Sequence, residues 1–431
     1  MTDIGVGLFG IALLLLLMLA RVPVAFALLL SASTGTFVIY DAQAVIGLFA
    51  AVPYEFTTHW TLTSIPMFLF MGFICYHAQL TQGIFNAASR WLNAPPGDLA
   101  HATIGATTVF SALSGSSVAC AAAMSKIAVP EMARRGYDPG LSAGVVAAAG
   151  TVGSMIPPSI LLLVYAVYAE VPVGQLFLAG VLPGLLTVAA FSLVVAVRVR
   201  KNPALAPVAE GGASWAERWA SLHQTWPLLG IIVVVLGGLF SGVFTPTESG
   251  AVGALLCLLY GVIARRLDWS AFTEAVEETL ISTASLFVIA IGAAVFTVFL
   301  ALTGLPDALT NAVLEWAASP VMVLFCIALV FLLLGMFLDP IGIMLITLPI
   351  LLPVVEASDI HLIWFGILMV KLLEIALVTP PVGLNVFVVK STLGESVKLG
   401  VVFKGVLWFL AADLLVLATL VLFPQLTLWV L

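Results

Sequence analysis

Long apolar segments separated by short polar ones occupy nearly the whole chain. The first six lie at roughly 4–20, 22–40, 60–80, 98–135, 139–170 and 174–197, and the next six at roughly 226–243, 246–264, 280–302, 320–357, 361–390 and 400–424. Apolar runs of about 20 residues are typical of helices that cross a membrane. The pattern predicts an all-α polytopic membrane protein with two halves, 1–200 and 226–431, joined by a cytoplasmic linker at 201–225.

Four of these segments are too long for one straight crossing, since about 20 residues cross the ~30 Å hydrocarbon layer. Those at about 98–135 and 320–357 are interrupted near their middles by SALSGSSVAC and MFLDPIGIM. They are predicted to be re-entrant helical hairpins with these stretches as tips. Those at about 139–170 and 361–390 contain double prolines, in GSMIPPS and TPPVGLN. Proline removes a backbone donor and clashes with the preceding turn, so both are predicted to be broken helices.

Composition supports a membrane protein and narrows the function classes. Of the 431 residues, 62% are hydrophobic and 9% are charged, which is too apolar for a soluble domain. The histidines lie near segment ends or in loops, and the isolated cysteines indicate packing residues rather than disulfides. Neither a metal-ligating cluster nor a nucleophile–base pair of an intramembrane enzyme is found in the sequence, and nothing suggests a nucleic-acid partner.

The basic residues give an orientation. If the chain starts outside and both hairpins return to their own side, the basic residues between segments face the cytoplasm with almost no exceptions, whereas Asp41, Glu170 and Asp307 lie outside. This positive-inside pattern predicts ten crossings, two hairpins and two periplasmic termini. The first apolar run lacks the basic start and the cleavage site of a signal peptide, so it is interpreted as a transmembrane helix.

Prolines recur between the two halves at one spacing. The spacing is 223 residues for the pairs Pro23 and Pro246, Pro130 and Pro353, Pro157 and Pro380, and Pro158 and Pro381. The same alignment places Ser116 on Asp339. Each half has five predicted crossings, an odd number, so the second half is predicted to be inverted relative to the first. Inverted-topology repeats with interrupted helices are typical of secondary transporters that bind substrate at the membrane midplane.

The hairpin tips and helix breaks are the candidate chemical sites. Backbone carbonyls freed at a proline break are costly in lipid unless something coordinates them, and Na⁺ with hydroxyl and carboxylate ligands would do so. Two pairs of tip and break therefore predict two Na⁺ sites with substrate between the tips. For the residues Ser114–Ser117, the alternative is close helix packing. Asp339 is an ionisable group at membrane depth, which makes it a candidate for ion binding. The alternative is that it caps the second hairpin arm, and the two roles are compatible.

Other polar residues within the apolar segments have two interpretations or a structural one. Lys371 and Glu374 are three residues apart, so they form either a buried ion pair or a site where Lys371 attracts an anionic substrate. Asp413 is interpreted as a scaffold or subunit contact. Residues 269–279 predict an amphipathic helix on the cytoplasmic surface.

Several motifs together resemble one family over essentially the whole chain. The stretch from SGSSVAC to GSMIPPS, then GVFTPTESGAVG and EIALVTPPVGLN, is similar to the large membrane subunit of tripartite ATP-independent periplasmic (TRAP) transporters. The resemblance implies an elevator-type transporter fold and import of an organic acid driven by a sodium gradient across the bacterial inner membrane. It also implies two partners, a small four-helix membrane subunit and a soluble periplasmic substrate-binding protein. No cofactor is expected, and Na⁺ is the coupling ion.

The resemblance also assigns site residues. The first Na⁺ site would contain Ser114, Gly115, Ser116, Ser117, Gly153, Ser154 and Pro157, and the second Asp339, Thr379, Gly383 and Asn385. Substrate contacts are expected at Ser116, Pro158, Pro381 and Lys371. Lys371 departs from the family pattern, which leaves a generic substrate assignment open. The alternatives are a stand-alone sodium/carboxylate symporter and a passive channel, although a channel would not require two inverted hairpins.

Overall fold

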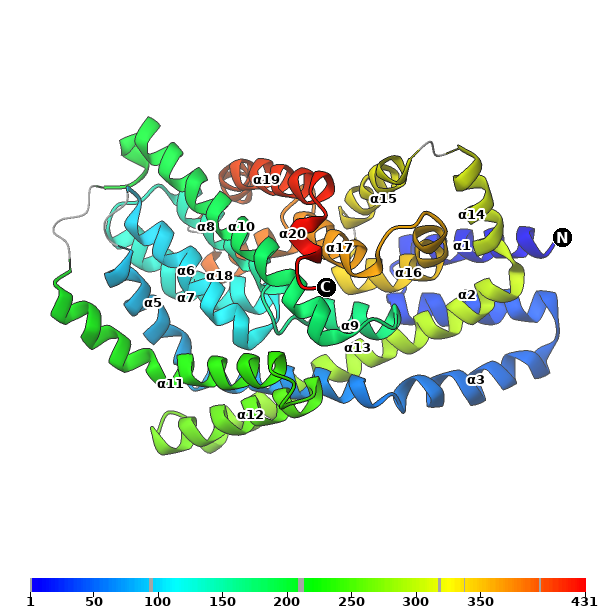
Figure 1. Ribbon diagram of the computed structural model, residues 1–431, viewed down its shortest axis with the longest axis horizontal. Coiled ribbons are helices and arrows are strands. Elements are labelled where there is room, and N and C mark those ends of the chain that lie inside the picture. Colours follow the sequence, from blue (N-terminus) through cyan, green and yellow to red (C-terminus); the bar gives the residue numbers. More distant parts are fainter. Residues whose placement is uncertain (1, 93–95, 208–212, 317–318, 337, 395–396) are drawn as a thin grey trace.

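The computed structural model describes residues 2–92, 96–207, 213–316, 319–336, 338–394 and 397–431 (Figure 1). These ranges form α-helices joined by turns and short 3₁₀ segments, and they contain no strand. Residues 208–212 of the predicted linker and residue 337 of the second predicted tip lie outside the described ranges.

Among the described residues, ten α-helices belong to the first half of the chain. They are α1 (Asp3–Leu19), α2 (Val24–Ile39), α3 (Ala42–Thr57), α4 (Ser64–His77), α5 (Leu80–Trp91), α6 (Asp98–Ser114), α7 (Ser117–Arg134), α8 (Pro139–Thr151), α9 (Ile160–Tyr168) and α10 (Val173–Lys201). The second half contains α11 (Trp215–Phe240), α12 (Pro246–Ile263), α13 (Trp269–Thr303), α14 (Leu305–Trp316), α15 (Pro320–Gly335), α16 (Pro340–Ala357), α17 (Leu362–Ala376), α18 (Leu384–Leu393), α19 (Leu399–Leu422) and α20 (Gln425–Leu428).

Several of these helices have the length and apolarity of membrane spans. Within the described residues six qualify, namely α10, α12, α13, α16, α19 and the stretch Trp60–His77 that contains α4, and the bent α11 would be a seventh. The apolar helices α1 and α2 have 17 and 16 residues and are shorter than the 18 residues required of a span. The broken helices are divided into short pieces. These differences explain why ten predicted crossings exceed the number of long helices, and the number of crossings stays a prediction.

The segment 98–135 forms two antiparallel helices. The first, α6, ends at Ser114, and α7 begins at Ser117, so the turn consists of Gly115 and Ser116. At the other end an Arg135 guanidinium nitrogen lies 3.5 Å from a carboxylate oxygen of Asp98. The two ends of the segment therefore meet, with SALSGSSVAC at the opposite end. The helices α15 and α16 are in contact and adjoin at Asp339, the N-cap of α16, but α15 packs mainly on α17 and α16 mainly on α14.

Both double prolines interrupt helices. Helix α8 ends at Thr151, a short 3₁₀ turn follows, and α9 begins at Ile160, so the Pro157–Pro158 pair lies in the bend between them. Helix α17 ends at Ala376 and α18 begins at Leu384, with Pro380 and Pro381 between them. The cause is the one anticipated from the sequence, the missing amide hydrogen and the steric clash of proline.

The structure differs from the sequence expectations at four other places. Segments interpreted as outside loops contain α3 and α14, and the amphipathic segment 269–279 is continuous with the next apolar segment in α13. No proline interrupts α13, so one helix continues through the change in polarity. The predicted linker 201–225 is shorter, because α11 begins at Trp215, where Ser214 and Glu217 form a capping box.

The two halves pack against each other rather than forming separate bodies. Helix α18 of the second half packs on α7 and α8, α19 packs on α8, and α12 packs on α4. Helix α13 runs diagonally from the lower middle towards the right of Figure 1 and contacts α1, α2, α3, α4, α14 and α16. This packing brings the hairpin tips and helix breaks of the two halves toward one region.

The contact between α8 and α19 depends on glycine. A Cβ at Gly405 would lie 1.9 Å from the carbonyl oxygen of Gly140, so Gly405→Ala forces the helices apart. We expect this change to lower the free energy of unfolding by about 1–3 kcal/mol, the usual cost of overpacking. Gly400→Ala in the same helix is the control, because nothing outside its own helix backbone lies within 4 Å of a Cβ added there. Thermal unfolding in detergent measures both; equal shifts would contradict this account of the packing.

Candidate functional site

A cavity of about 570 Å³ lies between the two hairpin tips. One wall contains Ser114–Ser117 of the first tip, and another contains Asp339, Pro340 and Ile341 of the second. The remaining walls come mainly from α4 and α13, with Ser154, Ile160, Leu161, Leu377 and Leu384 beside the helix breaks. Residues more than 200 positions apart in the chain therefore face one space.

Four helices of the described ranges begin at this cavity. Ser117, Ile160, Pro340 and Leu384 are the first residues of α7, α9, α16 and α18, and all four line it. Each helix start carries about half a positive elementary charge from its unpaired amide groups. The walls contain two carboxylates, Asp339 and Glu278. The site therefore combines convergent partial positive charge, which suits an anion, with hydroxyl and carboxylate oxygens, which suit a cation.

The first tip and the first helix break touch directly. The Gly115 carbonyl accepts a hydrogen bond from the Ile160 amide at 3.3 Å, and the Ser117 hydroxyl bonds to Ser154 and donates to the Thr151 carbonyl at 3.2 Å. A Cβ at Gly153 would lie 3.2 Å from the Ser116 backbone, which shows how closely the two strands of chain approach. Ser114 borders the same tip, and Pro157 lies buried in the bend. The structure thus brings together the residues assigned to the first site.

Asp339 is the N-cap of α16 and is partly exposed to the cavity. One of its carboxylate oxygens accepts a hydrogen bond from the Gly342 amide at 2.9 Å. A carboxylate has two oxygens and several lone pairs, so capping leaves acceptor capacity for a cation. The capping interpretation is thus realised and remains compatible with ion binding.

The second helix break gathers the other residues assigned to the second site. The Thr379 hydroxyl donates to the Ile375 carbonyl at 2.7 Å, and the backbone turns at Gly383, whose φ is +54°. The Asn385 side-chain amide donates to the Ala147 carbonyl of α8 at 3.2 Å, while its buried oxygen has no hydrogen-bond partner among the described residues. Among the described residues, no hydrogen bond joins Asp339 to the second helix break. The break lines the cavity through Leu377 and Leu384.

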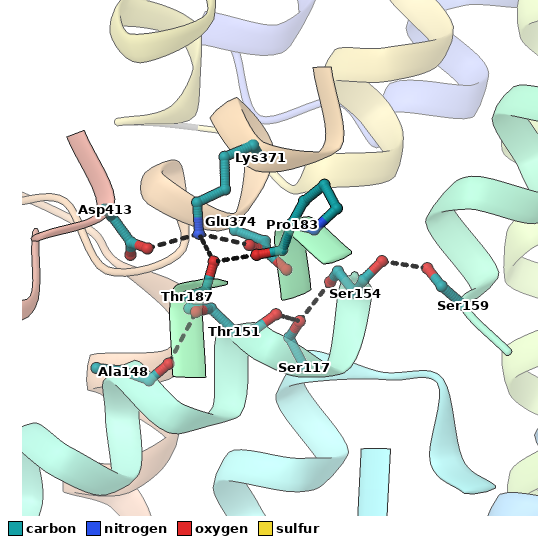
Figure 2. A network of polar contacts seen from close by, with 10 residues as sticks. All are labelled: Ser117, Ala148, Thr151, Ser154, Ser159, Pro183, Thr187, Lys371, Glu374 and Asp413. Carbon is teal, nitrogen blue, oxygen red and sulfur yellow. Dashed lines mark hydrogen bonds and ion pairs between the residues drawn. The ribbon is translucent and has the colours of Figure 1, made fainter. Parts of the chain in front are cut away.

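The expected substrate contacts are placed differently from one another. Ser116 lines the cavity, whereas Pro158 is buried behind Gly115 and Pro381 lies outside the lining. Lys371 is fully buried and also outside the lining. Figure 2 shows its ammonium group bonded to Thr187, Glu374 and Asp413, at 2.9, 3.1 and 2.6 Å. This geometry fits the buried ion pair of the two interpretations, and adds Asp413 to it.

Several cavity residues were not anticipated from the sequence. Glu278, Ser282 and Ser285 of α13 line it, and Tyr76 of α4 lines it while accepting a hydrogen bond from Lys126 at 2.9 Å. Glu278 also lies 3.2 Å from a ring nitrogen of His77. The available signal was the spacing of polar residues 278, 282 and 285, which places them on one helix face.

Solved transporter structures share this fold. The YdaH transporter of Alcanivorax borkumensis superposes with a TM-score of 0.61 at 17% identity, covering 91% of this chain and 90% of that one. At this identity the similarity concerns the fold alone.

Sequence relatives are more specific. The C4-dicarboxylate TRAP transporter large permease protein DctM of Pseudomonas aeruginosa is 37% identical over 397 residues, covering 91% of each chain. The sialic acid TRAP transporter large permease protein SiaM of Vibrio cholerae is 33% identical over 419 residues, covering 96% of this chain and 95% of that one. The family model of the tripartite ATP-independent periplasmic transporter DctM component matches residues 11–426. With that match over nearly the whole length, the chain belongs to the family of TRAP transporter large permeases.

Proposed function

We propose that this chain imports an organic carboxylate across the bacterial cytoplasmic membrane, driven by a Na⁺ gradient, with the cavity between the hairpin tips as the transport site. The observation that carries the proposal is the convergence of four helix N-termini on this cavity. Their amide groups and partial charges favour a carboxylate. A volume of about 570 Å³ is suited to a small organic molecule. The names of the relatives, for C4-dicarboxylates and sialic acid, are consistent with an acid as substrate.

Sodium coupling is supported by oxygen atoms at the breaks. Ser117 and Ser154 converge at the first, and the buried Asn385 oxygen lacks a partner at the second among the described residues. An unpaired buried oxygen is costly, and a hard cation would satisfy it. We assign the first Na⁺ to Ser114–Ser117, Gly153, Ser154 and Pro157, and the second to Asp339, Thr379, Gly383 and Asn385.

An inverted repeat and an elevator motion complete the proposal. Helices α7 and α16 begin 223 residues apart, at 117 and 340, and α8 and α17 begin 223 apart, at 139 and 362. This constant spacing supports two equivalent units, each with a hairpin and a broken helix. We propose that these units carry substrate and Na⁺ together past the other helices, in a chain with both termini periplasmic.

The proposed partners are a small membrane subunit and a soluble periplasmic protein that delivers the substrate. Reconstituted vesicles test the function: uptake of candidate acids is measured with and without an inward Na⁺ gradient, and with and without the binding protein. Uptake that requires both supports the proposal. Uptake by the chain alone would instead indicate a stand-alone symporter, and uptake without regard to Na⁺ would exclude sodium coupling.

Ser117→Ala tests the first Na⁺ site. The change removes the hydroxyl that links the first tip to Ser154 and Thr151, and a neutral contact of this kind contributes about 0.5–1.5 kcal/mol. We therefore expect the apparent Na⁺ affinity of uptake to fall by about two- to twelvefold. Ser125→Ala is the control, because among the described residues this buried serine of the same helix bonds to the Ala121 carbonyl alone and does not line the cavity. No shift with Ser117→Ala, or an equal shift with the control, would remove Ser117 from the site.

A further inference from the structure

A fully buried group of three ionisable side chains lies outside the cavity. Lys371 and Glu374 are on α17 and Asp413 is on α19, and all three side chains have zero exposed surface. Thr187 of α10 completes the group (Figure 2). Ionisable residues buried this completely are expensive in a membrane protein, so they are functional candidates.

The hydrogen bonds suit a charged Lys371. An ammonium group has three donors, and these are taken by Thr187, Glu374 and Asp413. The Thr187 hydroxyl donates its own hydrogen to the Pro183 carbonyl at 3.0 Å, so its oxygen accepts from Lys371. All donors on this side chain are therefore satisfied as a cation.

The carboxyl groups do not balance this single positive charge. If both were ionised, the group would carry a net charge of −1 with no exposed surface, which is strongly unfavourable. One oxygen of Glu374 and one of Asp413 are buried without a hydrogen-bond partner among the described residues. The net charge and the unpaired oxygens both make two ionised carboxylates unfavourable here. An additional proton on one carboxyl neutralises the group.

Within the part of the chain that the structure describes, no other charged side chain bonds to the group to balance it. Helix α17 packs against α9, α10, α15, α16, α19, α20 and the turn 152–154. The titratable side chains on these described elements are Tyr165, Tyr168, Arg198, Arg200, Lys201, Cys326, Glu356, Lys404 and Asp413. Of these, Asp413 alone bonds to the group, while Tyr165 donates to the Leu362 carbonyl and Arg198 to the Gly405 carbonyl.

We propose that Glu374 holds one exchangeable proton, so that Lys371, Glu374 and Asp413 form a neutral proton-binding site separate from the Na⁺ sites. Glu374 is the proton carrier because its contact to the ammonium is 3.1 Å, whereas Asp413 makes the shorter, 2.6 Å contact of an ionised partner. Binding adds one proton from water to the Glu374 carboxylate, and the charge of the group changes from −1 to zero.

Infrared difference spectroscopy of the full chain in detergent at neutral pH tests the site without any transport. The wild type is expected to show the carbonyl stretch of one protonated carboxylic acid that shifts on deuterium exchange. Glu374→Gln and Asp413→Asn each leave one carboxylate to balance Lys371, so both lose this band. Ser125→Ala changes no charge and lies outside the group, so it keeps the band and serves as the control.

Thermal stability gives a second measurement. Because the folded wild type binds one proton more than the unfolded chain near neutral pH, its stability falls as pH rises, and this part of the slope disappears in Glu374→Gln. A carboxylic acid band that persists in both Glu374→Gln and Asp413→Asn would overturn the proposal. The proposal would also be overturned if the wild type were stabilised by Na⁺ rather than by low pH and Glu374→Gln lost that effect. The group would then hold Na⁺. Neither result depends on whether the chain imports a carboxylate, so the proposed function stands or fails separately.

Discussion

Replacing Asp339 with asparagine is expected to lower the apparent Na⁺ affinity of uptake by about ten- to a hundredfold while the protein stays folded. The carboxylate at the second tip supplies the charge we assign to the second Na⁺ site, and a contact with a charged group contributes about 1.5–3 kcal/mol. Asparagine caps a helix about as well as aspartate, so the hydrogen bond to the Gly342 amide is preserved. Uptake in vesicles at graded Na⁺ concentrations measures the change.

Asp339→Ala separates the two roles of this residue. Alanine removes both the charge and the cap, which costs about a further 0.5–2 kcal/mol of stability. We expect the alanine protein to unfold at a lower temperature than the asparagine protein, with similarly weak Na⁺ dependence. If asparagine left the Na⁺ dependence unchanged while alanine impaired it, Asp339 would act only as a cap.

Gly115→Ala is expected to give the largest loss of stability among the changes at the tips. The residue has a φ of +58°, and a Cβ there would lie 2.5 Å from the Pro158 carbonyl oxygen. The left-handed backbone and the clash together cost about 2–5 kcal/mol. Because the clash separates the first tip from the first break, uptake should fall as well. Thermal unfolding and vesicle uptake are the two measurements.

Gly237→Ala provides the matched control for Gly115→Ala. Gly237 lies in α11, and no atom is within 4 Å of a Cβ added there. Alanine favours a helix over glycine by about 1 kcal/mol, so this variant should be at least as stable as the wild type. A loss of stability similar to that of Gly115→Ala would show that the tip geometry is not the cause.

Prolines and glycines in the sequence predicted most of the helix interruptions. Double prolines cannot continue a helix, and the Gly115–Ser116 pair favours a turn, so the helix ends follow from covalent structure and backbone freedom. The bounds of helix α13 and the presence of helix α3 could not be predicted from the sequence. The change from polar to apolar residues near 280 suggests a boundary, but nothing in the backbone requires one, and the structure has none.

Side-chain partners between distant helices could not be derived from the sequence. The i, i+3 spacing identified Lys371 and Glu374 as neighbours, whereas Asp413 joins them only because α17 and α19 pack together. In the same way, Glu278 of α13 faces the cavity because of how this helix packs across α4 and α16. Without the packing of the helices, the sequence offers many equally suitable contact partners for each such residue.

Helix α13 is longer than a membrane is thick. Its 35 residues span about 52 Å, against about 30 Å of hydrocarbon, so the helix either tilts or extends its polar start, residues 269–279, beyond the hydrocarbon layer. Glu278, Ser282 and Ser285 lie along this helix and line the cavity, so a change of tilt alters their distance from both hairpin tips. Lipid chain length is therefore expected to act on the proposed transport site through this helix.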